Sequence, residues 1–185
     1  KLTNEVVSAF EYNKELLEKS VFNKWIIKDI INLLIPLLEI SCKPYEKEYT
    51  LILLNIIYKN YRDNIKSSLI TLIPAVSNLF WDSKLVVQNI AKTTLENILK
   101  CSGNRDLDPF LPIVLSTFED PSTTADAIEK LAGCIFVQNV ECAAITIIEP
   151  ILNRGLKHNL YETQRKTCVI IDNMCKLVEH PKEIL

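Results

Sequence analysis

The 185-residue chain contains only three glycines, two histidines and one methionine. Three glycines leave little room for a loop that cradles a phosphate, and no Gly-x-x-x-x-Gly-Lys segment occurs. A histidine that acts as a general base needs a partner, and both His158 and His180 are expected in loops beside basic residues or helix ends. The sequence therefore predicts no catalytic residue, cofactor or metal ligand in this chain.

Long apolar runs are also missing. Charged residues such as Lys28, Asp29 and Glu39 interrupt the apolar stretches, and none of these stretches reaches the length of a membrane span. The first twenty residues are polar and charged, unlike the apolar centre of a signal peptide. No long run alternates apolar and polar residues, so no strand is predicted. These absences favour an all-α protein without a membrane partner.

Six cysteines are present, but the short paired spacings that bind zinc are not. The cysteines fall mostly within predicted helices, and a chain of this size with 48% hydrophobic residues does not depend on disulfides for its core. Reduced core thiols are the favoured interpretation, which predicts a cytoplasmic location. The six residues are Cys42, Cys101, Cys134, Cys142, Cys168 and Cys175.

Four prolines stand at equal intervals of 38 residues. Each follows or interrupts an apolar run, as in Leu34-Ile35-Pro36-Leu37. An interior proline removes one backbone hydrogen bond and kinks a helix, so we expect the same bend in the first helix of every repeat. The prolines are Pro36, Pro74, Pro112 and Pro150.

A second row of mostly apolar residues keeps phase with the prolines. Ile98, Phe136 and Met174 each lie 24 residues beyond a proline, and we predict that they are buried between layers of helices. Asp120-Pro121-Ser122-Thr123 indicates a turn followed by a helix start, and Gly155 indicates a helix boundary. Helices are predicted over residues 4–19, 25–40, 46–60, 65–80, 84–100, 108–118, 123–137, 142–154 and 161–178.

This period, with a proline in the first apolar stretch of each unit, resembles the HEAT repeat, a pair of antiparallel helices that stacks on its own copies. The predicted fold class is therefore all-α, an α-solenoid of stacked HEAT repeats. Residues 1–185 are expected to form a single HEAT-repeat domain with about four full repeats and partial repeats at both ends. The chain begins without methionine and stops where another first helix should start, so we expect a fragment of a longer protein.

The carboxy-terminal part resembles the HEAT domain of translation elongation factor 3, an ABC-F type ATPase. The resemblance rests on Ile148 to Leu156, on Thr163-Gln164-Arg165-Lys166 and on Val169 to Glu179, and it covers about residues 107–181. It implies a cytoplasmic, non-catalytic scaffold that binds ribosomal RNA and ribosomal proteins during elongation. ATP chemistry is then expected in downstream domains of the same chain, which are further partners.

Three other interpretations remain open. The HEAT-repeat activator of the amino-acid-starvation kinase carries a region similar to elongation factor 3. The sequence from Asp172 to Val178 favours the elongation factor. A generic HEAT adaptor would hold a protein ligand along its solenoid. A metabolic enzyme would need an active site that the sequence lacks.

Five basic residues straddle the predicted turn between the two helices of the last full unit. The resemblance implies that such a cluster meets ribosomal RNA phosphates, which an arginine binds with two parallel hydrogen bonds. Alternatively, the positive charge of Arg154 only interacts favourably with the helix macrodipole at a helix C-terminus, and Lys166 forms an ion pair with Glu162. A net charge of −2 argues for local binding that includes protein partners. The five candidates are Arg154, Lys157, His158, Arg165 and Lys166.

Overall fold

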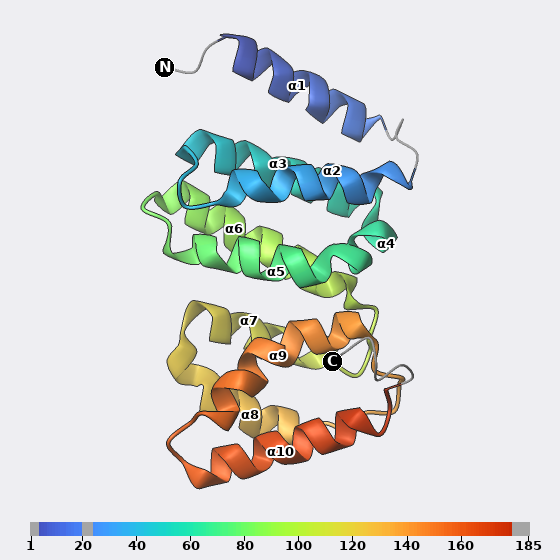
Figure 1. The fold of residues 1–185 in the computed structure, drawn as a ribbon, viewed down its shortest axis with the longest axis vertical. Helices are drawn as coiled ribbons and strands as arrows, with labels where there is room; N and C mark the ends of the chain where they lie inside the picture. Colours follow the sequence, from blue (N-terminus) through green and yellow to red (C-terminus); the bar gives the residue numbers. More distant parts are fainter. Residues whose placement is uncertain (1–3, 20–23, 179–185) are drawn as a thin grey trace. The chain divides into compact units, whose positions relative to one another are not determined.

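The computed structural model describes residues 4–19 and 24–178, and every regular element in them is helical (Figure 1). The prediction of an all-α chain is confirmed for this part of the protein. The chain divides into two compact units, Lys1–Cys101 and Ser102–Leu185, each built from helix pairs. Within the described ranges, no helix is both long and apolar enough to cross a membrane.

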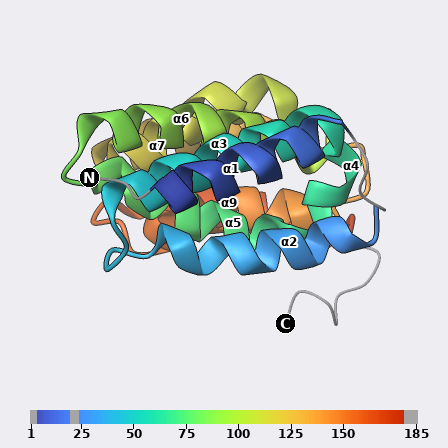
Figure 2. The ribbon, with the colours of Figure 1, turned by 90° about the horizontal axis from the view of Figure 1, so that it is seen from above.

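The first unit contains two helix pairs preceded by a single helix. Figure 2 shows α2 and α5 on one side of this unit, with α1, α3 and α6 on the other. Helix α3 packs between α1 and α6, while α5 packs against α6. The elements are α1 (Asn4–Glu18), α2 (Ile26–Leu34), the 3₁₀ turn η1 (Ile35–Leu38), α3 (Pro44–Asn60), α4 (Arg62–Ile65), η2 (Lys66–Ser68), α5 (Leu69–Ser77), η3 (Asn78–Trp81) and α6 (Leu85–Leu99).

Helix α3 forms the centre of this unit. Pro44 lies at its first position, where a missing N–H costs nothing, and Glu46 Oε2 accepts a hydrogen bond from the Lys43 amide at 2.8 Å. Leu51, Leu54 and Ile57 follow one another at intervals of three residues, share a face of the helix and are fully buried. Burial of side chains of this size stabilises the fold by about 1.5 to 3 kcal/mol each.

Hydrogen bonds between side chains join α3 to α6, one repeat further on. The Asn55 amide donates to Thr94 Oγ1 at 2.7 Å and accepts at Oδ1 from the Asn97 amide at 2.9 Å. The two bonds span 39 and 42 residues, close to one period. Because a half-buried amide must find partners away from water, these bonds fix the register between successive helix pairs.

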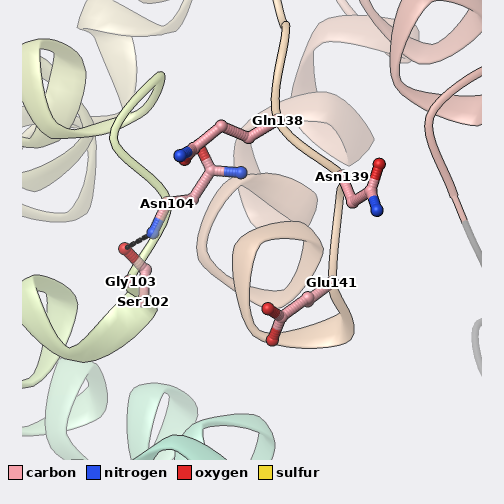
Figure 3. A pocket seen from close by; sticks show the side chains of 6 residues that line it. All are labelled: Ser102, Gly103, Asn104, Gln138, Asn139 and Glu141. Atoms are coloured by element: carbon pink, nitrogen blue, oxygen red, sulfur yellow. Dashed lines mark hydrogen bonds between the residues drawn. The ribbon is translucent and has the colours of Figure 1, made fainter.

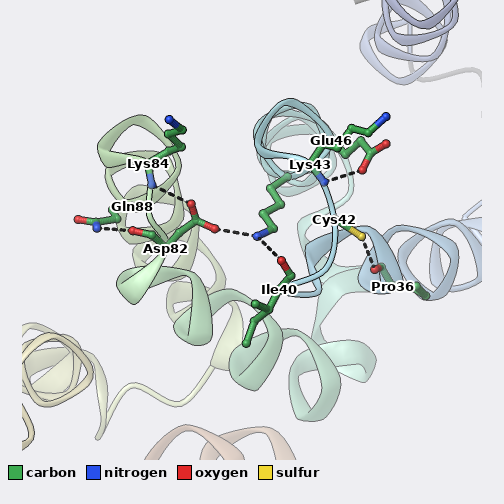
Figure 4. Close-up of polar contacts among 9 residues, drawn as sticks. Pro36, Ile40, Cys42, Lys43, Glu46, Asp82, Lys84 and Gln88 are labelled. Atoms are coloured by element: carbon green, nitrogen blue, oxygen red, sulfur yellow. Dashed lines mark hydrogen bonds and ion pairs between the residues drawn. The ribbon is translucent and has the colours of Figure 1, made fainter.

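A buried ion pair makes a second connection between these repeats (Figure 4). Lys47 Nζ lies 2.8 Å from Asp82 Oδ2, and the two side chains are 5% and 6% exposed. Lys47 also donates to the Ile40 carbonyl, and Asp82 accepts from the Lys84 amide at 2.9 Å. Burial alone would raise the pKa of Asp82, but the hydrogen bonds from Lys47 and Lys84 outweigh it and lower that pKa.

The second unit has two further helix pairs. Helix α7 packs against α8 and α9, and α10 packs against α8 and α9 in turn. Figure 1 shows α9 and α10 as an antiparallel pair, with both helices on the same side of their connecting turn. The elements are η5 (Asp108–Phe110), α7 (Leu111–Glu119), η6 (Pro121–Thr123), α8 (Thr124–Ala132), α9 (Cys142–Leu156) and α10 (Tyr161–Cys175), with η4 (Lys100–Ser102) at the division between the units.

The four repeating prolines all lie in the first helical segment of a pair, but their local settings differ. Pro74 and Pro150 stand inside α5 and α9, as predicted. Pro36 follows the end of α2 in η1, and Pro112 occupies the second position of α7. The prediction of one uniform bend is therefore wrong. Pro112 stands at a helix start, where no helical hydrogen bond is lost, whereas α2 gives way to a 3₁₀ turn at Pro36.

The prediction for Phe136 is also wrong. Ile98 and Met174 are buried, but α8 ends at Ala132, so Phe136 lies half-buried in the following loop. That loop has its own anchor: Asp106 Oδ2 accepts from the backbone amides of Val137 and Gln138 at 2.7 and 2.8 Å. These bonds hold the chain away from a continued helix.

Gly155 is the second-last residue of α9, so the predicted helix boundary is right to within two residues, and the glycine also has a packing role. It is buried, and a Cβ atom at this position would collide with Thr167 Oγ1 of α10 and lie 3.1 Å from Ile128 Cδ1 of α8. The absence of a side chain therefore lets α8, α9 and α10 approach one another closely.

The cysteines follow the core prediction only in part. Cys101 and Cys134 are buried, and burial raises the pKa of the Cys101 thiol to about 11, which keeps it protonated at neutral pH. Cys42 and Cys142 are half-buried. Cys168 and Cys175 are exposed on α10, contrary to the prediction, because the buried face of that helix runs through Thr163, Thr167, Ile170 and Met174.

Candidate functional site

The structure places all five predicted basic residues around the turn between α9 and α10. Arg154 lies in the last turn of α9, and Lys157 and His158 follow its end. Arg165 and Lys166 lie in the first half of α10. The other histidine, His180, is outside the described residues.

Arg165 and Lys166 are already paired with carboxylates of the same chain. Arg165 donates through Nε and Nη2 to the two oxygens of Glu162, at 3.2 and 2.9 Å. Lys166 binds Glu129 of α8 and lies 3.5 Å from Glu162. The hydrogen bond to Glu162 raises the pKa of Arg165, and the one to Glu129 raises the pKa of Lys166. The expected pair between Lys166 and Glu162 is thus present, with Glu129 as the nearer partner.

Arg154 is in the opposite situation. Its Nε and Nη2 atoms are buried and have no hydrogen-bond partner, and no carboxylate among residues 7–19 and 24–178 forms an ion pair with it. Burial lowers the pKa of its guanidinium, since the charged form has lost solvent without gaining a counter-ion. Two unpartnered buried donors are costly to the fold, so the favourable macrodipole of α9 does not account for this arrangement by itself.

A cavity of about 310 Å³ has Arg154 in its lining. Its wall contains Arg154 from the last turn of α9, Lys157, His158 and Asn159 from the turn that follows, Pro121 of η6 and Thr124 at the start of α8. We call this cavity the Arg154 pocket.

Two hydrogen bonds fix His158 within the Arg154 pocket. The ring accepts at Nδ1 from the Leu160 amide at 3.1 Å, and the His158 carbonyl accepts from Gln164 at 2.8 Å. A neutral imidazole that accepts at Nδ1 carries its proton on Nε2. Positively charged groups and donors therefore dominate this pocket.

A second cavity, of about 390 Å³, was not found from the sequence (Figure 3). Asn104 Oδ1 accepts from the amides of Asp106 and Leu107, and Gln138 Oε1 accepts from the Arg105 amide. Gly103 has a φ of 69°, which favours glycine. These hydrogen bonds hold together the loops that border the cavity. Its lining residues are Ser102, Gly103, Asn104, Gln138, Asn139 and Glu141.

A third, more apolar cavity of about 620 Å³ lies beside the prolines of η5 and α7. Phe110 and Ile113 line it, and Lys130 is its single charged residue. No group of three or more histidine, cysteine or acidic side chains in the described part of the chain is placed to hold a metal ion.

Stacked pairs of helices with a proline period of 38 residues define an α-solenoid of the HEAT-repeat class. Two family models match the sequence. "EF3 N-terminal HEAT repeat" matches residues 11–95, and "Elongation factor 3/GNC1 HEAT repeat" matches residues 122–185.

Curated relatives extend the similarity over most of the chain. Elongation factor 3B of Saccharomyces cerevisiae is 33% identical over 165 residues, which are 89% of this chain and 16% of the yeast protein. Elongation factor 3 of Pneumocystis carinii is 32% identical over 159 residues, 86% of this chain and 15% of that protein. Elongation factor 3 of Phytophthora infestans is 38% identical over 112 residues, 60% of this chain and 11% of that protein. The chain belongs to the HEAT-repeat region of the elongation factor 3 family.

Proposed function

We propose that this chain is the non-catalytic HEAT-repeat scaffold of an elongation-factor-3-like translation factor, and that it binds the ribosome during elongation. The observation that carries this proposal is the match of both units to HEAT repeats of elongation factor 3. On this view the chain works in the cytoplasm, and its partners are ribosomal RNA, ribosomal proteins and other domains of its own protein. ATP binding and hydrolysis then belong to those other domains.

The turn between α9 and α10 is the proposed ribosome contact. Lys157 and Arg165 are exposed there, and Arg165 keeps part of its guanidinium open to solvent despite its bond to Glu162. Phosphate contacts through lysine and arginine supply most of the sequence-independent affinity for nucleic acids. A net charge of −2 limits that contribution to a local cluster, so protein contacts must supply the rest.

The relatives bear on the alternative interpretations. Those described above are named elongation factors, which favours the elongation factor over the starvation-kinase activator. The experiment separates the generic adaptor from both, because both of those interpretations place the chain on the ribosome and a generic adaptor is not expected there.

The test is co-sedimentation of the full-length protein with ribosomes. Replacing Arg154, Lys157, Arg165 and Lys166 with glutamate should reduce the bound fraction and weaken the salt dependence of the binding that remains. The matched control carries four lysine-to-glutamate changes on exposed positions of the first unit, at Lys28, Lys43, Lys59 and Lys84. Circular dichroism must show the same helix content in both variants.

Three outcomes would count against the proposal in different ways. Equal loss in both variants means that net charge, and not this turn, governs binding. Undiminished binding of the folded cluster variant moves the contact elsewhere on the solenoid. Failure of the wild-type protein to bind ribosomes favours the generic adaptor.

A further inference from the structure

We propose that the Arg154 pocket binds a single phosphate group and that Arg154 is the residue that recognises it. The proposal rests on the proposed function only for the biological source of this phosphate, which would be the RNA backbone. The pocket's chemistry is the same for a free phosphate ion or a nucleotide, and the experiment below separates these sources.

The first argument is the charge balance within the basic cluster. Arg165 and Lys166 are held by Glu162 and Glu129, so an incoming anion must compete with carboxylates already in place. Arg154 has no such competitor: it forms no ion pair with a described carboxylate, and burial lowers the pKa of its half-buried guanidinium. The five residues therefore divide into two that are paired with carboxylates, Arg165 and Lys166, and three that line the cavity, Arg154 among them.

The second argument is the set of donors that line the pocket. Arg154 and Lys157 supply full charges, the His158 ring carries its proton on Nε2, and Asn159 has an amide. Four donor groups suit a phosphate, whose several oxygens accept more hydrogen bonds than a carboxylate does. An Asp or Glu side chain in the lining would oppose such a ligand, and none is found there.

The third argument is the helix ends that meet at the pocket. Thr124, the first residue of the nine-residue helix α8, lines it, so the positive end of that helix dipole adds to the attraction for an anion. At the end of α9, the carbonyls of Arg154 and Gly155 already accept from the amides of Lys157 and His158. The negative end of α9 is thereby partly satisfied and opposes an anion less.

The size of the pocket sets the class of ligand. About 310 Å³ is at the lower limit of cavities that hold small molecules. One phosphate group with a few waters fits this volume, while the remainder of a nucleotide or RNA strand would lie outside. The pocket is therefore expected to recognise a phosphate group and not the bases of a nucleic acid.

The experiment measures thermal stability of the 185-residue chain with inorganic phosphate, with sodium acetate and with sodium chloride at equal ionic strength. Phosphate should raise the melting temperature of the wild type more than the other two salts do. Arg154→Met should lose this gain, with phosphate affinity reduced about tenfold or more, as expected for the loss of charge-assisted hydrogen bonds. The matched control Arg165→Met should keep it.

A second readout separates ligand recognition from a structural role. Without phosphate, Arg154→Met should melt at or above the wild-type temperature, because it removes a half-buried charge that has no counter-ion. If this variant does not fold, Lys157→Gln against Arg165→Gln repeats the comparison with exposed residues. The proposal is overturned if phosphate gives no specific gain, if acetate gives the same gain, or if the gain survives in Arg154→Met or, in the fallback comparison, in Lys157→Gln.

A short oligouridine identifies the source, with uridine as the control that has no phosphate. Arg154-dependent binding of the oligouridine that exceeds the binding of inorganic phosphate supports an RNA backbone. Equal binding of both supports free phosphate or a nucleotide. If the chain binds phosphate but the full-length protein does not sediment with ribosomes, the phosphate site is supported and the proposed function is rejected. If the wild-type chain binds phosphate but Arg154→Met does not change ribosome binding, the phosphate site is kept and only the RNA backbone is rejected as its ligand.

Discussion

In residues 1–101, successive helix pairs are joined by polar side chains shielded from water, whereas residues 102–185 join theirs by close apolar packing and an exposed ion pair. The Lys47–Asp82 pair and the Asn55 amide make the connections in the first unit. In the second unit Gly155 lets three helices meet, and Lys166 reaches Glu129 at the surface. These links span 35 to 42 residues where side chains bond directly.

The comparison shows that the repeat period fixes where neighbouring pairs can be linked but not by what chemistry. A buried ion pair is costly to break, since the surviving partner stays buried without a counter-charge. A surface ion pair contributes little, and close packing tolerates no added volume. The two units should therefore fail in different ways, which the following predictions test in order of expected size.

The largest effect is expected in the first unit, from Lys47→Met. Asp82 would keep its charge with only the Lys84 amide and neighbouring donors, so the free energy of unfolding should fall by about 3 to 5 kcal/mol. Urea unfolding of the 185-residue chain measures this change. The double variant Lys47→Met with Asp82→Leu should recover much of the loss; equal instability of single and double variants would contradict the prediction.

The same pair predicts a pH dependence. The pKa of Asp82 is lower in the folded chain than in the unfolded one, so ionised Asp82 stabilises the fold above the ordinary carboxyl range. This stabilisation should decline as the pH falls towards and through the lowered value. Asp82→Asn should flatten that part of the stability profile, and an unchanged acid slope in this variant would remove Asp82 as its source.

An intermediate effect is expected in the second unit, from Gly155→Ala. The new methyl group would press on Thr167 and Ile128, and overpacking of this kind costs about 1 to 3 kcal/mol. Gly133→Ala is the matched control, because its Cβ would meet only the Lys130 carbonyl, at 3.5 Å. Thermal unfolding should show a loss for Gly155→Ala and a change within about 1 kcal/mol for the control. Similar changes in both variants would show that backbone freedom, and not packing, determines the stability change at Gly155.

The smallest effect is expected in the loop after α8, from Asp106→Ala. The amides of Val137 and Gln138 would lose their acceptor, at a cost of about 0.5 to 1.5 kcal/mol. Hydrogen exchange should speed up at these two amides while the helices remain protected. Asp108→Ala, two residues further on in η5, is the control. Unchanged exchange at Val137 and Gln138 would mean that the loop is held by other contacts.

Helix positions were predictable because the signals for them are local. Apolar spacing, prolines at first turns and capping residues act within a few residues, so most predicted helices agree closely with the observed ones. Ile98 and Met174 are buried for the same reason. The failure at Phe136 comes from a distant residue, since Asp106 takes the amides that a continuing helix would need.

The position of the candidate site could be predicted from the sequence, but which of its charged side chains are paired could not. Five basic residues near one turn could be read from their numbering, and so could the pairing of Lys166 with Glu162 four residues away. The nearer partner Glu129 is 37 residues away in the sequence. The isolation of Arg154 could not be read either, because it depends on which atoms surround a guanidinium after packing.

The sequence by itself determined the helical repeat and its period, because equal spacing of prolines and apolar residues constrains every unit in the same way. Only the tertiary structure decided which charges are paired, which cation borders a cavity, and why residue 155 is a glycine. The physical reason is range: a helix forms from contacts between neighbours in sequence, whereas pairing and burial depend on atoms that stacking brings together from different repeats.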